Sequence, residues 1–530
     1  VSTVITQVSV GEKVGEEVAA SFTIDNFKPY DEDEQVHLPR FTKEQVEKLS
    51  DEEVKNHFSK APLNGLDLNE IELGEERTLR LMKLLLQHRD IFAKNDLNPG
   101  TFNHEGVSIN TGDATPRAFP LRPIMPHLRP IVEAKLKDML DYNIIEPSRS
   151  PWGAAVLLVP KKVIPGCTPD YRFCIDFRRL NQVTKKDAYP LPRIDDSLSA
   201  LEGNSYFSTC DAVQGFFQCP LRGDADKEKT AFRTHAGHYQ FRKMPFGLVN
   251  APSEYQRFMD NALRGLTFKI CLIFVDDVCV MSPTFEKHLE DLGTVFDALR
   301  KAGIHLKAKK CHFAKSSVKF LGHEISARGV VPNQDKVKAI LDRNPTSRVE
   351  VRAWLGLSNY YRRYIKGYAR MVRPLTVFMN SKKKWTGLSP EMEKAVREVK
   401  QALTSKPVLA HPNFDLPFEI QCDASPVAIS ACLVQRVGEI EKVIMYASRA
   451  LKPAEMRYHQ YEREALALVW ACAVYRPYVL GRSFTVVTDC KALLYLTTRS
   501  HSARIIRWVV ALEEYNASYR HRAIELSTLN

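Results

Sequence analysis

Apolar residues surround a pair of adjacent carboxylates in the segment CLIFVDDVCVMS, residues 271–282. The β-branched and apolar residues on both sides predict two strands, so Asp276 and Asp277 would lie at the tip of a β-hairpin. A carboxylate withdrawn from water must be neutralised, hydrogen-bonded or metal-bound. The pattern therefore implies a partner for the pair, although a tight turn stabilised by aspartate side chains would explain it equally well.

Periodic segments before this hairpin predict both helices and strands. Apolar residues three and four positions apart predict a helix over 75–93, and residues 133–148 have a helical pattern as well. Residues 153–162 predict a strand. Residues 203–219 predict a strand, a turn and a helix, with Asp211 closing the strand.

Residues 238–263 predict a strand, a Pro-Phe-Gly corner and a helix. Asn250 is the expected N-cap of this helix, and Pro252 falls in its first turn, where the missing N–H costs nothing. The helix should therefore begin at the corner.

A helical pattern over 349–380 combines aromatic and basic residues. Its apolar positions, three and four apart, are Trp354, Leu357, Tyr361, Tyr364 and Tyr368. The basic residues between them are Arg352, Arg362, Arg363, Lys366 and Arg370. The aromatic spacing favours a buried core over a base-stacking platform, and the basic residues are candidates for phosphate contacts.

Beyond about residue 410 the pattern changes. FEIQCDAS, AISACLVQ and KVIMYASR predict successive strands, EREALALVWACAVYRPYV predicts a helix, and SFTVVTDC predicts another strand. This order is typical of a separate α/β domain.

Length and composition favour a folded protein of several domains. The 530 residues exceed one ordinary core, and 44% hydrophobic with 26% charged residues is typical of soluble globular proteins. The sequence shows neither a membrane span nor a signal peptide, so we expect a cytosolic or nuclear chain. The 11 cysteines form no CxxC pair and are expected to be reduced and mostly buried.

The charge is unevenly distributed. The formal charge is +12, while residues 1–60 hold 13 acidic and 7 basic residues, so the remainder carries +18. An excess of this size favours a polyanionic partner, because Lys and Arg that neutralise phosphates gain affinity from counterion release.

Clustered carboxylates are also what phosphoryl transfer needs. That chemistry depends on divalent cations held by Asp or Glu and bridging the attacking and leaving oxygens. Asp211 at a strand end and Asp276 at the hairpin tip could converge on such cations. Asp277 would then point elsewhere or share the second metal.

The order of motifs identifies a family. The matching stretches are INTGDATPRAFPLR, IIEPSRSPWGAAVLLVPKK, YRFCIDFRRLNQVTKKDAYPLPRIDD, YFSTCDAVQGFFQCPL, KTAFRTHAGHYQFRKMPFGLVNAPSEYQRFMD, FVDDVCV and AGIHLKAKKCHFAKSSVKFLGHEIS. They resemble the reverse transcriptase of gypsy-class LTR retrotransposons and their retroviral and pararetroviral relatives. The resemblance implies a multidomain α/β (α+β) fold, a right hand of fingers, palm and thumb, and RNA- and DNA-templated DNA synthesis.

The resemblance assigns roles to matching positions. Asp211, Asp276 and Asp277 would hold two Mg²⁺ ions, with Mn²⁺ as the alternative metal. The implied nucleotide-binding residues are Lys161, Lys162, Arg172, Ala212, Val213, Phe216 and Phe246. Phe216 would exclude a ribose 2′-OH and make dNTPs the substrate. The segment around Leu321, Gly322 and His323 would hold the primer end.

Two departures from the family pattern concern this first half. Phe274 stands where Tyr is commonest before the aspartate pair, so a hydroxyl is lost but the ring is kept. The fingers loop KKVIPGCTPDYRF is longer and more apolar than usual, which weakens the assignment of Lys161 and Lys162.

The C-terminal segment resembles the ribonuclease H domain of the same elements, through QCDASPVAISACL, VIMYASRALKPAEMRYHQYEREALALVWA, YRPYVLGRSFTVVTDCKAL and RIIRWVVALEEYNASYRHR. The resemblance makes Asp423, Glu464 and Asp489 catalytic metal ligands, and Glu462 structural. The family's fourth carboxylate has no counterpart, since no Asp follows His521. We therefore expect weak or absent ribonuclease H activity.

The resulting division is an acidic, weakly structured lead-in at 1–75, fingers and palm at 76–345, thumb or connection helices at 346–410, and a C-terminally incomplete ribonuclease H-like domain at 411–530. The chain is expected to be a portion of a Pol polyprotein. Its expected partners are an RNA template, a DNA primer, an RNA–DNA hybrid and dNTPs, with no membrane and with homodimerisation left open. Cytoplasmic virus-like particles, and the nucleus as an alternative, are the expected location.

Two other functions stay open. A pararetroviral polymerase would share every motif, and a catalytically inactive remnant would bind nucleic acid without extending it.

Overall fold

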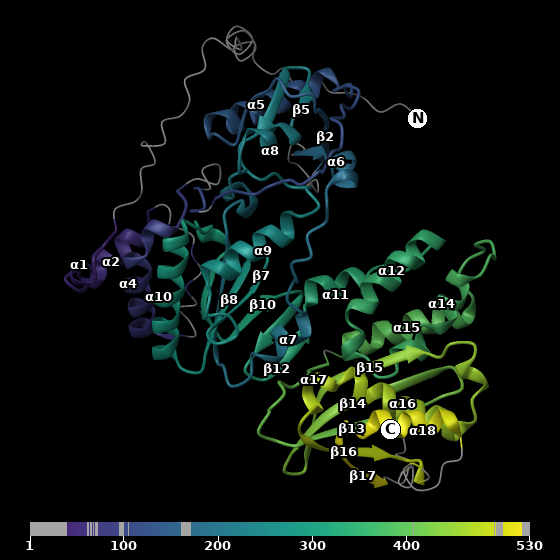
Figure 1. Cartoon of the computed structure of the whole chain (residues 1–530). Coiled ribbons are helices and arrows are strands. Elements are labelled where there is room, and N and C mark those ends of the chain that lie inside the picture. The colour runs from purple at the N-terminus through teal and green to yellow at the C-terminus, as the bar shows by residue number, and fades with distance from the viewer. Residues whose placement is uncertain are drawn as a thin grey trace, which may run out of the picture.

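The computed structural model describes residues 40–60, 63, 66, 68, 73–94, 100–103, 105–160, 171–405, 407–491, 493 and 502–521. Over these residues the chain forms four sheets with helices packed around them (Figure 1). The architecture is mixed α/β in several domains, as predicted from the sequence.

The first described segment is more ordered than the sequence analysis expected. α1 (Lys43–Glu47) and α2 (Asp51–Phe58) each begin with a capping box, which satisfies the backbone N–H groups at their N-termini. α2 packs against α4 (Glu75–Gln87), which buries Leu81 and Leu85 and is followed by the short helix η3 (Arg89–Ile91). The expectation of a weakly structured lead-in was therefore wrong for α1 and α2, because these caps stabilise short helices that also gain tertiary contacts.

The fingers sheet has the strand order β1-β6-β5-β2-β3. Its strands are β1 (Ile145–Pro147), β2 (Ala154–Pro160), β3 (Tyr171–Asp176), β5 (Phe232–Thr234) and β6 (Gly237–Phe241). The helices of this region are η4 (Pro126–Leu128), α5 (Arg129–Asp141), α6 (Arg178–Val183) and α8 (Asp224–Lys229). The helix predicted over 133–148 thus ends at Asp141. Residues 145–147, predicted to be helical, form strand β1.

The palm sheet has the strand order β7-β8-β4-β9. Its strands are β4 (Tyr206–Asp211), β7 (Cys271–Phe274), β8 (Asp277–Ser282) and β9 (His312–Lys315). Helices α7 (Ile194–Ser199), η5 (Gly215–Gln218), α9 (Ala251–Ala262), α10 (Phe285–Ala302) and η6 (Ala308–Lys310) belong to the same region. α9 packs against β7 and α10 against β8, which explains the near-continuous apolar sequence of this hairpin.

A small sheet leads into a set of helices. The sheet contains β10 (Ser317–Phe320), β11 (His323–Ser326) and β12 (Gly329–Pro332). The helices, here called the thumb helices, are α11 (Gln334–Leu341), α12 (Arg348–Tyr360), η7 (Arg362–Tyr364), α13 (Tyr368–Met371), α14 (Arg373–Asn380) and α15 (Pro390–Thr404). Trp354, Tyr361, Tyr364 and Tyr368 are buried, which confirms the core interpretation, whereas Leu357 is 40% exposed.

The C-terminal sheet has the strand order β15-β14-β13-β16-β17. Its strands are β13 (Phe418–Ala424), β14 (Ala428–Val437), β15 (Ile440–Ala450), β16 (Ser483–Thr488) and β17 (Asn516–His521). Its helices are η8 (Glu455–Arg457), α16 (Gln460–Val474), α17 (Arg476–Val479) and α18 (Ala503–Leu512). The first three strands in sequence are antiparallel, while β16 and β17 add in parallel beyond β13.

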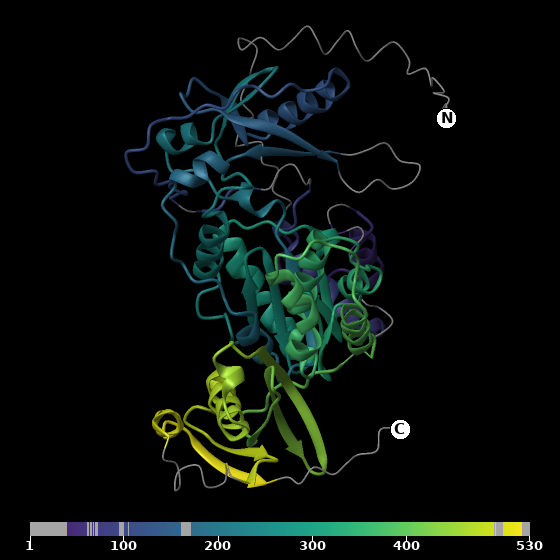
Figure 2. The ribbon, with the colours of Figure 1, turned by 90° about the vertical axis from the view of Figure 1, so that its right-hand side faces the viewer.

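The thumb helices connect the palm to the C-terminal sheet (Figures 1 and 2). η7 and α13 pack against β15, and the Ala369 N–H donates to Ser448 Oγ at 2.9 Å. On the palm side, Arg363 forms an ion pair of 2.6 Å with Asp195. The Ser199 and Tyr478 hydroxyls lie 2.9 Å apart, so the palm and the C-terminal domain also touch directly.

The described cysteines are unpaired and mostly buried, as predicted from the sequence. All ten cysteines among the described residues are free thiols, and eight of them are buried. Within the described part of the chain, no helix has the length and apolar character needed to cross a bilayer.

The buried side chain of His288 joins α10 to two strands of the palm sheet. His288 on α10 lies 2.6 Å from Ser208 Oγ of β4 and 3.0 Å from Ser282 Oγ of β8, and Ser282 donates to Asp291. Burial lowers the pKa of His288 to about 3. The imidazole is therefore neutral in the folded protein at neutral pH and supplies one donor and one acceptor.

Acid should destabilise this fold through His288. The pKa of His288 is lower in the folded chain than its ordinary 6.5, so its stabilising contribution is complete above pH 6.5 and is lost as the pH falls below that value. One such group loses about 2 kcal/mol between pH 6.5 and 5. We expect the melting temperature to fall over this range, and to fall less steeply in His288→Asn. His127→Asn, at an exposed position, should keep the wild-type slope, and an unchanged slope in His288→Asn would contradict the assignment.

Candidate active sites

Two strands of the palm sheet end in aspartates that face each other. Asp211 at the end of β4 pairs in register with Asp277 at the start of β8. Val275 and Asp276 form the turn between β7 and β8, and Val275 has a φ of 55°. A β-branched residue in this region is strained. The turn is supported from α9, since the Val275 N–H donates to Gln256 Oε1 at 2.6 Å.

Loss of hydration, and then neighbouring charge, raises the pKa of Asp277 and Asp211. The pKa of Asp277 is raised to about 6, first by loss of hydration and then by the charges of Asp276 and Asp211. Loss of hydration also raises the pKa of Asp211, against the opposing charge of Lys310, whose Nζ lies 3.0 Å from both carboxylate oxygens. A positive charge at this end of the sheet therefore stabilises the ionised acids.

The carboxylates of Asp211, Asp276 and Asp277 are the type of ligand that divalent cations prefer. Within the described residues, no three His, Cys, Asp or Glu side chains stand close enough to form a complete metal site. The three aspartates are nevertheless hard oxygen donors of the kind Mg²⁺ prefers. They act on one another electrostatically, and Asp211 already contacts a cation in the ammonium of Lys310.

The loop after β4 differs in one respect from the expectation. Ala212 and Val213 are buried, and the Val213 N–H donates to His305 O at 3.0 Å. Val213 was predicted to bind the nucleotide, but its N–H is used here in a contact with the segment after α10. Gln214 follows with a φ of 44°, which turns the chain into η5.

The ring of Phe216 packs against two other aromatic rings. Its ring centroid is 4.9 Å from that of Phe246 and 5.4 Å from that of Tyr255. Phe246 and Arg172, both exposed, line an adjacent cavity of about 590 Å³, together with Phe217. The structure thus brings three of the predicted nucleotide-binding residues to one region, while Lys161 and Lys162 lie outside the described residues.

The predicted primer-binding segment is the turn between β10 and β11. Leu321 and Gly322 both have positive φ angles, 49° and 75°. Two thumb tyrosines hold this turn, with Tyr360 donating to Leu321 O at 2.5 Å and Tyr361 to Gly322 O at 3.0 Å. His323 is buried, so what it can offer a bound strand is limited to its backbone.

A second group of acids lies in the C-terminal domain. Glu464 on α16 is buried and its Oε2 has no hydrogen-bond partner, while Asp423 on β13 and Asp489 after β16 are exposed. The pKa of Glu464 is raised to about 7 by burial and then by the charges of Asp489 and Asp423. An unpaired carboxylate oxygen beside two acids fits a divalent cation. Glu462 pairs instead with Arg504 at 2.9 Å, in line with the structural role expected for it.

Comparison with known proteins matches both halves of the chain. The family described as "Reverse transcriptase (RNA-dependent DNA polymerase)" matches residues 159–325, and the "RNase H-like domain found in reverse transcriptase" matches residues 388–486. The chain is 36% identical over 445 residues to the retrovirus-related Pol polyprotein from transposon 297 of Drosophila melanogaster, covering 84% of this chain and 42% of that protein. The corresponding protein from transposon gypsy is 33% identical over 479 residues, covering 87% and 46%.

The chain belongs to the reverse transcriptase family of retrovirus-related Pol polyproteins. It spans less than half the length of these curated relatives. The family predicted from the order of motifs is therefore confirmed.

Solved reverse transcriptases have the same fold. The foamy viral protease-reverse transcriptase in complex with double-stranded DNA aligns with a TM-score of 0.76 at 21% identity, over 91% of this chain and 82% of that one. The same foamy viral protein in complex with an RNA/DNA hybrid aligns with a TM-score of 0.72 at 21% identity, over 96% and 67%. These likenesses support the fold alone.

The sequence analysis missed three residues around the polymerase acids: Lys310, Gln256 and Tyr255. Lys310 stands 99 positions from the aspartate it contacts, and only the cation-rich KAKKCHF stretch could have drawn attention to it. Gln256 and Tyr255 are fully buried on α9, and nothing local distinguishes them from ordinary core positions.

Gly215 should tolerate no side chain in this reverse transcriptase. A Cβ there would lie 2.7 Å from Tyr255 Oη and 2.9 Å from its Cζ, inside the wall that carries Phe216. We expect Gly215→Ala to destabilise the protein by about 1–3 kcal/mol through overpacking, measured as a lower melting temperature. Gly223→Ala, where a Cβ would meet nothing within 4 Å, is the control. Equal melting temperatures for the two variants would show that Tyr255 moves to accommodate the added methyl group.

Proposed function

We propose that this chain is an RNA-directed DNA polymerase that extends a DNA primer on RNA and DNA templates. The observation that carries the proposal is the register of Asp211 and Asp277 beside a strained turn bearing Asp276, in a chain of the reverse transcriptase family. Loss of hydration and then neighbouring acids raise the pKa of Asp211 and Asp277, and perturbed acids of this kind favour a functional reason for keeping them.

The three aspartates would bind two Mg²⁺ ions, with Mn²⁺ as the alternative. When bound, these ions supply the positive charge that activates a primer hydroxyl and stabilises the departing pyrophosphate. Asp211 would exchange its contact with Lys310 for part of that charge. Because Lys310 and the metal ions all carry positive charge, either contact would favour the ionised carboxylate of Asp211.

The fingers would bind the incoming dNTP. Arg172 on β3 is exposed beside the cavity and could neutralise phosphate charge. Phe216 packs on the buried ring of Tyr255 and cannot retreat into the core, which suits a residue that excludes a ribose 2′-OH.

Nucleic acid is the proposed partner. The net charge of +12 favours binding of a phosphate backbone. The foamy viral relatives of this fold were solved with double-stranded DNA and with an RNA/DNA hybrid. By analogy, this chain would hold a primed template across the palm, with the turn at Leu321 and Gly322 near the primer end. Homodimerisation and a location in cytoplasmic virus-like particles stay predictions.

The C-terminal domain would hydrolyse RNA in a hybrid. Asp423, Glu464 and Asp489 would bind the divalent ions, which supply an activated water when present. Among these acids only Glu464 is buried, so it would be the one whose proton must leave before a cation binds.

Primer extension tests the polymerase. Wild-type protein with Mg²⁺ and dNTPs should extend a primer on an RNA template, and Asp276→Asn should lose nearly all extension, since one cation ligand becomes neutral. Asp276 is exposed at the turn, so hybrid binding and the melting temperature should stay near wild-type values. Hybrid binding without extension by either protein would support the inactive nucleic-acid-binding alternative. Full extension by Asp276→Asn would place the metal site elsewhere.

Hybrid cleavage tests the second site. We expect the 530-residue polypeptide to cleave a labelled RNA–DNA hybrid slowly or not at all, because Asp423, Glu464 and Asp489 match the family's carboxylates while no Asp follows His521. Any residual Mg²⁺-dependent cleavage should disappear in Glu464→Gln. Rapid turnover by the wild-type polypeptide would contradict the expected impairment.

A further inference from the structure

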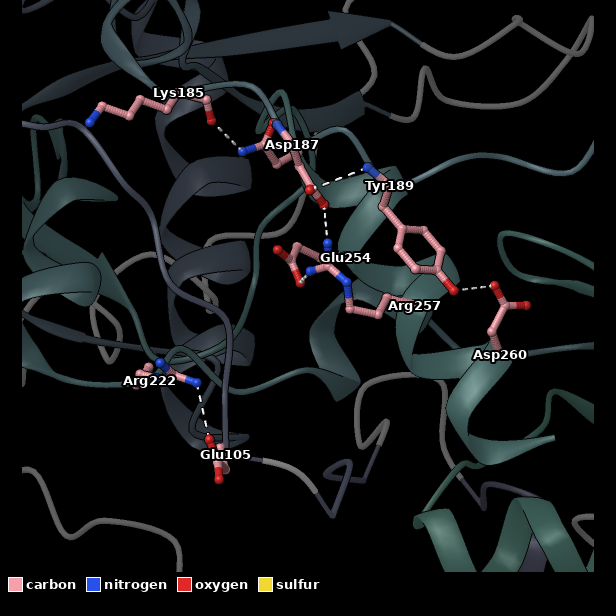
Figure 3. Close-up of polar contacts among 9 residues, drawn as sticks. Glu105, Lys185, Asp187, Tyr189, Arg222, Glu254, Arg257 and Asp260 are labelled. Atoms are coloured by element: carbon pink, nitrogen blue, oxygen red, sulfur yellow. Dashed lines mark hydrogen bonds and ion pairs between the residues drawn. The ribbon is translucent and has the colours of Figure 1, made fainter. Parts of the chain in front are cut away.

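Residues 185–193, here called the strap, lie between α6 and α7 in the chain. Their polar contacts with residues of α9 are drawn in Figure 3. Its beginning is fixed by Asn250, whose side chain donates to Lys185 O at 2.8 Å and accepts from the Asp187 N–H at 3.1 Å. Asn250 is the N-cap residue of α9, as predicted, but its side chain makes no hydrogen bond to the first turn of that helix. Its side chain is used for the strap instead.

The strap is then clamped on both sides of Tyr189. Arg257 on α9 binds Asp187 at 2.5 Å and Glu254 at 2.7 Å. Its guanidinium also lies 4.8 Å from the centroid of the Tyr189 ring. Asp187 accepts from the Tyr189 N–H at 3.3 Å. Asp187 therefore holds the backbone of Tyr189, and Arg257 packs on its ring (Figure 3).

The hydroxyl of Tyr189 begins a chain of hydrogen bonds that ends at the catalytic turn. It donates to Asp260 Oδ2 at 2.6 Å. The other oxygen, Asp260 Oδ1, accepts from Gln256 Nε2 at 2.9 Å. Gln256 is fully buried, and its Oε1 accepts the Val275 N–H at 2.6 Å. Three hydrogen bonds, through Asp260 and Gln256, thus link Tyr189 of the strap to Val275, the residue immediately before Asp276.

The chemistry of this chain fixes its direction. A carboxylate only accepts hydrogen bonds, so Asp260 requires the NH₂ end of the Gln256 amide. The carbonyl end must then face Val275, whose N–H needs an acceptor. A flipped amide would set two donors against each other at the turn and leave the part-buried Val275 N–H unpaired. Asp260 therefore sets the orientation of the Gln256 amide, and Tyr189 holds Asp260 in place.

We propose that Tyr189 is a positioning residue for the catalytic turn, acting through Asp260 and Gln256. Val275 has a positive φ that its side chain disfavours, so the turn depends on outside contacts to keep its shape. The Gln256 contact is one of these. The consequence is that the strap, 83 to 91 positions before Asp276 in sequence, helps to aim the carboxylate of that residue. The catalytic part of this inference rests on the proposed polymerase function.

The test is Tyr189→Phe, which removes the hydroxyl and keeps the ring over which Arg257 lies. Loss of one hydrogen bond in the chain should lower kcat for primer extension by about 3- to 10-fold. KM for dNTP should stay within about twofold, because no nucleotide contact is altered. Tyr239→Phe is the matched control, since it removes a hydroxyl bonded to Ala236 O in the fingers sheet, and it should keep wild-type kcat.

A double variant separates positioning from general destabilisation. Gln256→Met keeps a side chain of similar size and breaks the chain at its last link. If Tyr189 acts through Gln256, Tyr189→Phe should cause no further loss of kcat in the Gln256→Met background. An additional loss equal to that in the wild-type background would overturn the proposal.

Hydrogen exchange supplies a readout that needs no activity. Tyr189→Phe should speed amide exchange in the peptide that contains Val275, while Tyr239→Phe should leave it unchanged. Unchanged exchange in Tyr189→Phe would overturn the proposal even if kcat fell. Faster exchange in a protein that does not extend primers would support the structural link and count against the polymerase function, so the two failures are distinguishable.

Discussion

Like charges held close together at the ends of buried strands are the constraint on which this polymerase domain depends. Asp211 and Asp277 pair across β4 and β8, and Asp276 adds a third carboxylate at the adjoining turn. Partial loss of hydration, and then the charges of Asp276 and Asp211, raises the pKa of Asp277 to about 6. Without a cation the ionised cluster is unfavourable. Lys310 offsets part of that cost at Asp211, and divalent ions would offset more.

The surrounding fold holds these acids in an arrangement they would not adopt alone. The palm sheet is packed by α9 and α10, and His288 ties α10 to β4 and β8 from below. Above, Gln256 supports a turn whose Val275 backbone is strained. A rigid frame of this kind explains how repelling groups stay in register. It also explains why residues far from the acids can influence them.

The C-terminal domain places its acids differently. Glu464 is buried with one carboxylate oxygen lacking a partner, while Asp423 and Asp489 are exposed. Burial, and then the charges of Asp489 and Asp423, raises the pKa of Glu464 to about 7. The thumb helices pack between this domain and the palm, and a direct contact joins Ser199 to Tyr478. The two sites therefore sit on one connected framework.

The sequence by itself determined the features that depend on local pattern. Alternation and apolar runs predicted the hairpin with Asp276 and Asp277 at its tip, and the order of motifs predicted the family. Contacts between distant segments could not be predicted in this way, because a side chain's partner depends on which elements meet in space. Tertiary structure alone decided that Lys310 binds Asp211, that the Asn250 side chain bonds the strap and not the first turn of α9, that the Val213 N–H is already bonded, and that His323 is buried.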